Sequence, residues 1–138
     1  LDCGATFSIF PENQEIDFGA FSARDIVNQQ TRMRTFSIRT TKVQDAQCSD
    51  GFKMDSSFYT TETLSADDTA VLIGNGLKLR ILNGTEPYTF NQYKEYADFT
   101  GDTMNVEQNY TAELSREEGK AIQSGPFETV VLFKSNYH

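Results

Sequence analysis

Hydrophobic and polar residues alternate along most of this chain, in short runs that are separated by turn residues. The clearest runs cover residues 34–41, 52–59, 77–82 and 109–114, and further apolar runs lie at 1–10 and 71–73. Alternation with a period of two indicates half-buried β-strands. Only residues 22–27 have the pattern of a helical turn, with Ser22 as its N-cap and Asp25 at the third position. Seven or eight short strands without an internal repeat predict an all-β sandwich.

The last fourteen residues, 125–138, contain a strand that is apolar on both faces. One face carries Val130 and Leu132, and the other carries Phe127, Thr129, Val131, Phe133, Ser135 and Tyr137. Such a strand is typical of the centre of a sheet, with cover on both faces. The pattern leaves open what lies beside residues 127–137. They form either an ordinary central strand between two strands of their own chain, or a strand whose second neighbour comes from another polypeptide.

Length and charge limit the possible classes of protein. With 138 residues, the sequence is expected to form one domain that covers 1–138. The net charge of −8 argues against sequence-independent binding to nucleic acid and against docking on anionic lipid. No apolar run has the length that a membrane span requires, so we expect no membrane insertion.

The sequence offers little chemistry for catalysis or metal binding. His138 is the only histidine, and the cysteines have no zinc-ligand spacing, so we expect no metal and no cofactor. Aspartate and glutamate are plentiful, but no spacing selects a catalytic pair of carboxylates. We therefore do not expect an enzyme.

Cys3 and Cys48 lie in or beside predicted strands. Either both thiols are free, or they form one bridge between neighbouring strands. A bridge that closes a loop of this length would stabilise the fold by about 4 kcal/mol in the chain-entropy model. It would also indicate an oxidising compartment such as the periplasm or the cell surface.

Five aromatic residues gather in the least regular part of the chain, at Tyr88, Phe90, Tyr93, Tyr96 and Phe99. We favour the interpretation that they fold onto the edge of the sandwich. The alternative is a ligand platform, in which case the protein would be a self-contained, secreted, lectin-like sandwich that binds host glycans.

A set of short motifs is spread over essentially the whole chain: Cys3, 16–21, 24–27, 36–39, Cys48 and 76–83. At the C-terminal end, Gly125 is the fourteenth residue from the terminus and Tyr137 is the penultimate one. Together these residues resemble the subunits of chaperone–usher pili, the adhesive fibres of Gram-negative bacteria. Pilins carry a glycine and an aromatic residue at these two C-terminal places.

The resemblance implies an incomplete immunoglobulin-like sandwich that lacks its last strand and leaves a hydrophobic groove between the first and last strands. A periplasmic chaperone fills the groove first, and at the outer-membrane usher the N-terminal extension of the next subunit replaces it. The implied groove residues are Ala5, Phe7, Ile9, Gly125, Phe127, Thr129, Val131, Phe133 and Tyr137. Cys3 and Cys48 correspond to the two cysteines of a pilin, which makes them the implied disulfide pair.

By this resemblance, the protein is a structural subunit of an adhesive pilus, of minor or tip type, or the pilin domain of a tip adhesin. It would pass through the periplasm to the bacterial cell surface and could meet a host receptor there. Only Leu1 and Asp2 precede Cys3, whereas a polymerising pilin carries a longer donor-strand extension at this place. The extension could have been deleted to stop polymerisation, replaced by a lectin domain, or removed for crystallisation. No sugar-binding residue follows from the resemblance.

Overall fold

The computed structural model of the chain describes residues 6–29, 31–43, 52–99 and 105–138. The described residues form nine strands and one short helix, which confirms the predicted all-β class. The elements are β1 (Thr6–Phe10), α1 (Ala23–Gln29), β2 (Thr31–Val43), β3 (Phe52–Tyr59), β4 (Val71–Gly74), β5 (Leu77–Asn83), β6 (Glu86–Pro87), β7 (Lys94–Phe99), β8 (Asn105–Arg116) and β9 (Leu132–Tyr137). No helix in this part of the chain has the length and apolarity that a membrane crossing requires.

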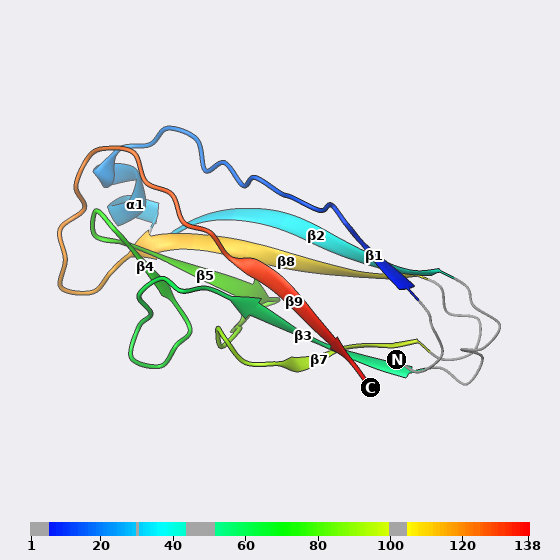
Figure 1. Cartoon of the computed structure of the whole chain (residues 1–138). Coiled ribbons are helices and arrows are strands. Elements are labelled where there is room, and N and C mark those ends of the chain that lie inside the picture. Colours follow the sequence, from blue (N-terminus) through cyan, green and yellow to red (C-terminus); the bar gives the residue numbers. More distant parts are fainter. Residues whose placement is uncertain (1–5, 30, 44–51, 100–104) are drawn as a thin grey trace.

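The strands form two antiparallel sheets that run along the long axis of the molecule (Figure 1). The larger sheet has the order β1-β2-β8-β5-β4, and β6 pairs with β5 beside this path. The smaller sheet has the order β7-β3-β9. The strand at the N-terminal end of the chain and the strand at the C-terminal end are thus both edge strands, in different sheets.

The core lies between the two sheets because each strand turns its apolar face inward. The larger cluster contains Phe18, Ile38, Phe58, Val71, Leu77, Leu79, Ile81, Phe90, Tyr110, Ala112 and Leu114. A smaller cluster contains Met54, Tyr96, Ala97 and Phe99. Phe133 of β9 packs against both clusters and so joins them.

One hydrogen-bonded tyrosine ties the sheets together. Tyr96 of β7 accepts a hydrogen bond of 3.2 Å from Thr40 Oγ1 of β2. Its hydroxyl also lies 3.2 Å from the carbonyl of Ile38 and 3.3 Å from that of Val106. Because the ring is 7% exposed, burial is the main cause that raises the pKa of Tyr96 above its ordinary value.

The predicted helical turn forms, and its cap is the one expected from the sequence. Ser22 Oγ accepts a hydrogen bond from the backbone amide of Asp25, and Asp25 Oδ2 accepts one from the amide of Ser22. This reciprocal pair satisfies two amides that the helix itself cannot bond. The same pair of residues lowers the pKa of Asp25, chiefly through the backbone amide of Ser22.

The sequence predicts that the stretch from Tyr88 to Phe99 is the least regular part of the chain, and this prediction is wrong for residues 94–99. The structure places β7 here and pairs it with β3. Its burial does not follow a strict alternation, since Tyr96 and Ala97 are neighbours and both are buried. A register shift between Met54 and Asp55 of β3 accompanies this irregularity, so local pattern alone did not reveal the strand.

Candidate functional site

The strand β9 has a strand neighbour on only one side in the described part of the chain. It pairs with β3 from Met54↔Tyr137 to Tyr59↔Leu132. Along its other edge, no strand among the described residues pairs with it. The alternative of a central strand between two strands of its own chain is therefore not what the described residues form.

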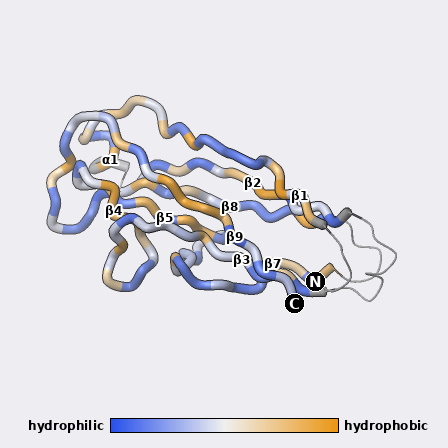
Figure 2. The backbone as a smooth tube through the Cα atoms, viewed as in Figure 1, coloured by the Kyte–Doolittle hydropathy of each residue, from blue (hydrophilic) through white to orange (hydrophobic). Residues whose placement is uncertain are grey.

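The inner face of the C-terminal segment is half-buried throughout. We call its residues the inner row: Phe127, Thr129, Val131, Phe133, Ser135 and Tyr137. Figure 2 shows the hydrophobic stretch that leads along this segment into β9. Within the row, the ring of Phe133 lies 5.6 Å from Phe58 and 5.5 Å from Tyr96, centroid to centroid. The inner row therefore contacts the core, but other residues cover it only in part.

The outer face of the same segment differs from the expectation. Val130 is 64% exposed and Leu132 is 50% exposed, so the predicted cover on both faces is wrong for this face. The reason is that β9 belongs to the smaller sheet, and within the described chain the other sheet covers only the inner surface. A pattern that is apolar on both faces shows where the apolar side chains lie, but not whether other residues of the same chain cover both faces.

Four apolar residues of the N-terminal part flank the inner row, and we call them the N-terminal flank: Phe7, Ile9, Ile16 and Phe21. At one end, Phe7 stacks on Tyr137 with centroids 4.4 Å apart. At the other end, Phe21 meets Phe127 at 5.9 Å. All four flank residues are half-buried and pack against the core clusters.

Residues 11–22, which contain Ile16 and Phe21 of the N-terminal flank, form no strand beside the inner row. Residues 11–22 lie outside strands, and among the described residues no backbone hydrogen bond joins them to residues 125–137. Figure 1 shows both segments running between the end at α1 and the end where β1 and β9 lie. No strand among the described residues pairs with the edge of β9 that lies away from β3, so this edge can accept another strand.

The structure places the predicted site residues as follows. Phe7, Ile9 and the apolar residues of the inner row pack against the two core clusters, and their role as a groove stays a prediction. Gly125 precedes the inner row in an exposed turn, with φ of +128°, a conformation that favours glycine. Ala5, Cys3 and Cys48 lie outside the described residues, so the disulfide stays a prediction. The sequence analysis did not include Ile16 and Phe21 in the site. The alternation of Ile16 and Phe18 with polar residues was a signal in the sequence that this segment has an apolar face.

The aromatic residues of the 88–99 stretch belong mainly to the core. Phe90, Tyr96 and Phe99 are at most 7% exposed, which confirms the interpretation that they fold onto the sandwich. Tyr88 is half-buried and contacts Phe58 and Tyr110 by its ring edge. Only Tyr93 of the five is exposed, so these residues do not form an aromatic platform for a glycan.

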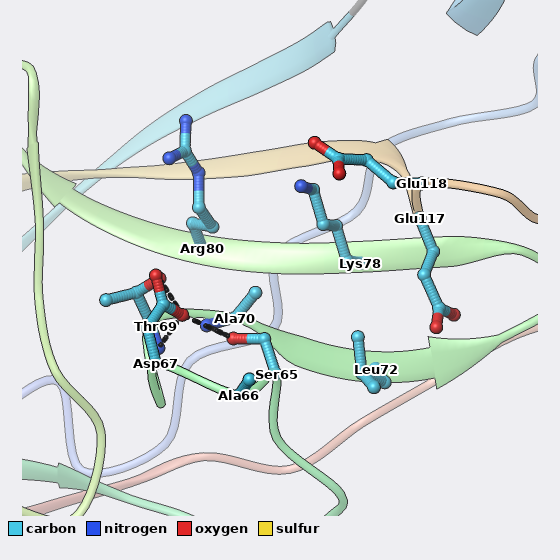
Figure 3. Close-up of a pocket in the computed structure, with 10 residues that line it drawn as sticks. All are labelled: Ser65, Ala66, Asp67, Thr69, Ala70, Leu72, Lys78, Arg80, Glu117 and Glu118. Carbon is cyan, nitrogen blue, oxygen red and sulfur yellow. Dashed lines mark hydrogen bonds between the residues drawn. The ribbon is translucent and has the colours of Figure 1, made fainter.

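A separate pocket of about 370 Å³ lies between the 65–70 turn and β5 (Figure 3). Several of its polar groups already have partners. Asp67 accepts hydrogen bonds from the hydroxyls of Thr69 and Ser65, and these bonds lower its pKa to about 2. Arg80 forms a salt bridge with Glu113. The described residues contain no group of side chains that could hold a metal ion. We therefore assign no function to this pocket.

No protein-family model matches the sequence. Several solved structures do match the fold. The P pilus rod subunit PapA has a TM-score of 0.74 and 17% sequence identity, over 96% of this chain and 99% of PapA. A chaperone–usher pilus structure that concerns rod uncoiling also has a TM-score of 0.74 and 17% identity, over 100% of this chain and 90% of its own.

The match to the CupB6 tip adhesin from Pseudomonas aeruginosa is partial. It has a TM-score of 0.53 and 18% identity, over 76% of this chain and 30% of the adhesin. At these identities, the three likenesses show the fold of the chain. They agree with the resemblance that the short motifs and the C-terminal residues indicated.

Proposed function

Because this chain has the pilin fold, an incomplete immunoglobulin-like sandwich, we propose that it is a structural subunit of an adhesive chaperone–usher pilus. In this proposal, a strand from another polypeptide completes the smaller sheet at β9. The observation that carries it is the combination of an open edge on β9 with the half-buried inner row beside that edge.

The chemistry of such docking is β-strand addition. The incoming strand would take its affinity from main-chain hydrogen bonds to β9, and its specificity from side chains that contact the inner row. Phe133 and Val131 would lie beneath the middle of the strand. The contacts Phe7–Tyr137 and Phe21–Phe127 would mark its two ends.

The partners follow from the same proposal. A periplasmic chaperone would supply the strand first, and the N-terminal extension of a neighbouring subunit would replace it at the outer-membrane usher. The assembled protein would then lie at the bacterial cell surface and could meet a host receptor there. The position as a minor or tip-type subunit stays a prediction, since the fold matches include both rod and tip proteins.

The test is thermal unfolding of the purified chain, with and without a peptide from the N-terminal extension of a candidate neighbouring subunit. We expect the peptide to raise Tm, because a ligand that binds only the folded state stabilises it. A scrambled peptide of the same composition is the control. A single cooperative transition that neither any such peptide nor a periplasmic chaperone shifts would contradict the proposal.

Two matched variants test where the peptide binds. Val131→Asp places a charge in the inner row, whereas Asn136→Asp places the same charge on the exposed outer face of β9. We expect the first variant to lose the peptide-induced rise in Tm and the second to keep it. Equal peptide affinity in both variants would count against docking at the inner row.

A further inference from the structure

Two exposed apolar side chains lie on the outer face of the smaller sheet, on the C-terminal segment itself. Leu132 is the residue of β9 that pairs with Tyr59 of β3. Val130 lies just before β9, and its carbonyl accepts a hydrogen bond of 3.1 Å from Thr60 Oγ1. This bond keeps the backbone of Val130 beside the end of β3. Exposed and half-buried residues alternate along 128–137, so Val130 and Leu132 share the outer face.

The side chain of Lys134 covers the ring of Tyr59 on this outer face, with its ammonium 3.7 Å from the ring centre. Val130 and Leu132 stay exposed. Among the described residues, five large apolar side chains are exposed, and Val130 and Leu132 are two of them. Apolar side chains that adjoin an open strand edge favour association, so a partner at this edge is the natural cover for them.

We propose that the strand which docks on β9 is recognised on both of its faces. Its inward side chains contact the inner row, and its outward side chains opposite Val130 and Leu132 are apolar and cover them. This inference rests on the proposed function, since it requires a strand at the open edge of β9. Its occupant is an extended segment of another polypeptide that is apolar on both faces near its middle.

The geometry of antiparallel strand pairs supports this assignment. Side chains that lie opposite each other on one face of neighbouring strands have Cβ atoms about 4.5–5.5 Å apart, which is contact distance for Val and Leu. The open edge belongs to β9, and Val130 lies two residues before Leu132, the first residue of that strand. A strand that forms main-chain bonds to this edge therefore places an outward side chain next to Leu132, and one that extends past the start of β9 also places one next to Val130.

The test compares two synthetic strand peptides with lysines at both ends for solubility. Both carry Val at every position that faces the inner row. The apolar peptide has Val at the two outward positions opposite Val130 and Leu132, and the polar peptide has Thr there. Valine and threonine have similar shape and strand preference, so only the polarity of the outer face differs. Affinities are measured by isothermal titration calorimetry with the unmodified chain.

We expect the apolar peptide to bind roughly tenfold more tightly than the polar one, because two cross-strand apolar pairs are gained. The double variant Val130→Thr/Leu132→Thr is the matched control, and it should bind the two peptides with equal affinity. Its fold is checked by circular dichroism. Since both residues are exposed, we expect the variant to unfold at nearly the same temperature as the unmodified chain.

Three other outcomes of these measurements would each contradict the inference. Equal binding of both peptides to the unmodified chain would overturn the inference and leave the proposed function intact. Failure of both peptides to bind would contradict the proposed function and the inference together. If the peptides bind equally and the unmodified chain self-associates in analytical ultracentrifugation while the double variant does not, Val130 and Leu132 form an interface between copies, which also overturns the inference.

Discussion

The ring of Phe7 stacks on the ring of Tyr137, with centroids 4.4 Å apart and planes inclined by 16°. Phe7 belongs to β1, the edge of the larger sheet, and Tyr137 belongs to β9, the edge of the smaller sheet. The stack therefore joins the two ends of the described chain across the sandwich. It also fixes one end of the open edge at which we propose that a strand docks.

The first prediction concerns the energy of this stack. In a double-mutant cycle with Phe7→Leu and Tyr137→Leu, we expect a coupling of about 1 kcal/mol in the free energy of unfolding, as for other aromatic pairs. Urea denaturation of the four proteins measures it. A parallel cycle with Phe10→Leu, an exposed residue of the same strand, should show no coupling to Tyr137→Leu. Additive effects in the first cycle would mean that the stack contributes nothing specific.

The second prediction compares two neighbours on β9. Phe133→Ala should lower the free energy of unfolding by about 3 kcal/mol, because it removes a ring that contacts both core clusters. Leu132→Ala should cost under about 1 kcal/mol, since this side chain is exposed in the chain alone. Chemical denaturation without any added peptide checks both values. Similar losses in the two variants would contradict the assignment of inner and outer faces.

The third prediction concerns the hydrogen bonds by which Tyr96 joins the two sheets. Tyr96→Phe removes the hydroxyl that bonds Thr40 and a backbone carbonyl, and so leaves buried polar groups without a partner. We expect a loss of about 1–3 kcal/mol in the free energy of unfolding. Tyr93→Phe removes the same atom from an exposed ring and should have no measurable effect. If both variants are as stable as the unmodified protein, the buried hydroxyl is not needed to hold the sheets together.

The fourth prediction concerns high pH. Burial raises the pKa of Tyr110 above its ordinary value of 10.0, and the ring is 4% exposed. In the unfolded chain this hydroxyl ionises near pH 10, whereas in the folded protein it stays neutral to higher pH. The unfolded state therefore gains stability above pH 10, and the free energy of unfolding should fall by up to about 1.4 kcal/mol per pH unit for this group.

Unfolding by urea between pH 9 and pH 11 measures this slope. The slope should be shallower in Tyr110→Phe, because this variant lacks the hydroxyl of Tyr110 and keeps only the other buried tyrosine hydroxyls, such as that of Tyr96. Tyr93→Phe is the control for the loss of an exposed tyrosine hydroxyl. An unchanged slope in Tyr110→Phe would show that other groups cause the alkaline loss of stability.

The sequence by itself determined which stretches form strands wherever alternation was strict. The run at 34–41 lies inside β2, the run at 109–114 lies inside β8, and β3 has the bounds that were expected. Ser22 and Asp25 likewise form the expected cap, because capping depends on residues that are neighbours in the chain. The pairing of Phe7 and Ile9 with the C-terminal segment came from the resemblance, and the structure has these residues in one region.

Tertiary structure alone decided which faces are covered. Periodicity places Val130 and Leu132 on one face and Val131 and Phe133 on the other, but it does not say where a second layer lies. The order β7-β3-β9 makes β9 an edge strand of the smaller sheet, and this order is set by contacts between residues far apart in the chain. For the same reason β7 was missed, since its irregular burial depends on the register shift in its partner β3. Local pattern determines the faces of a strand, and only the packing of the whole chain determines what those faces meet.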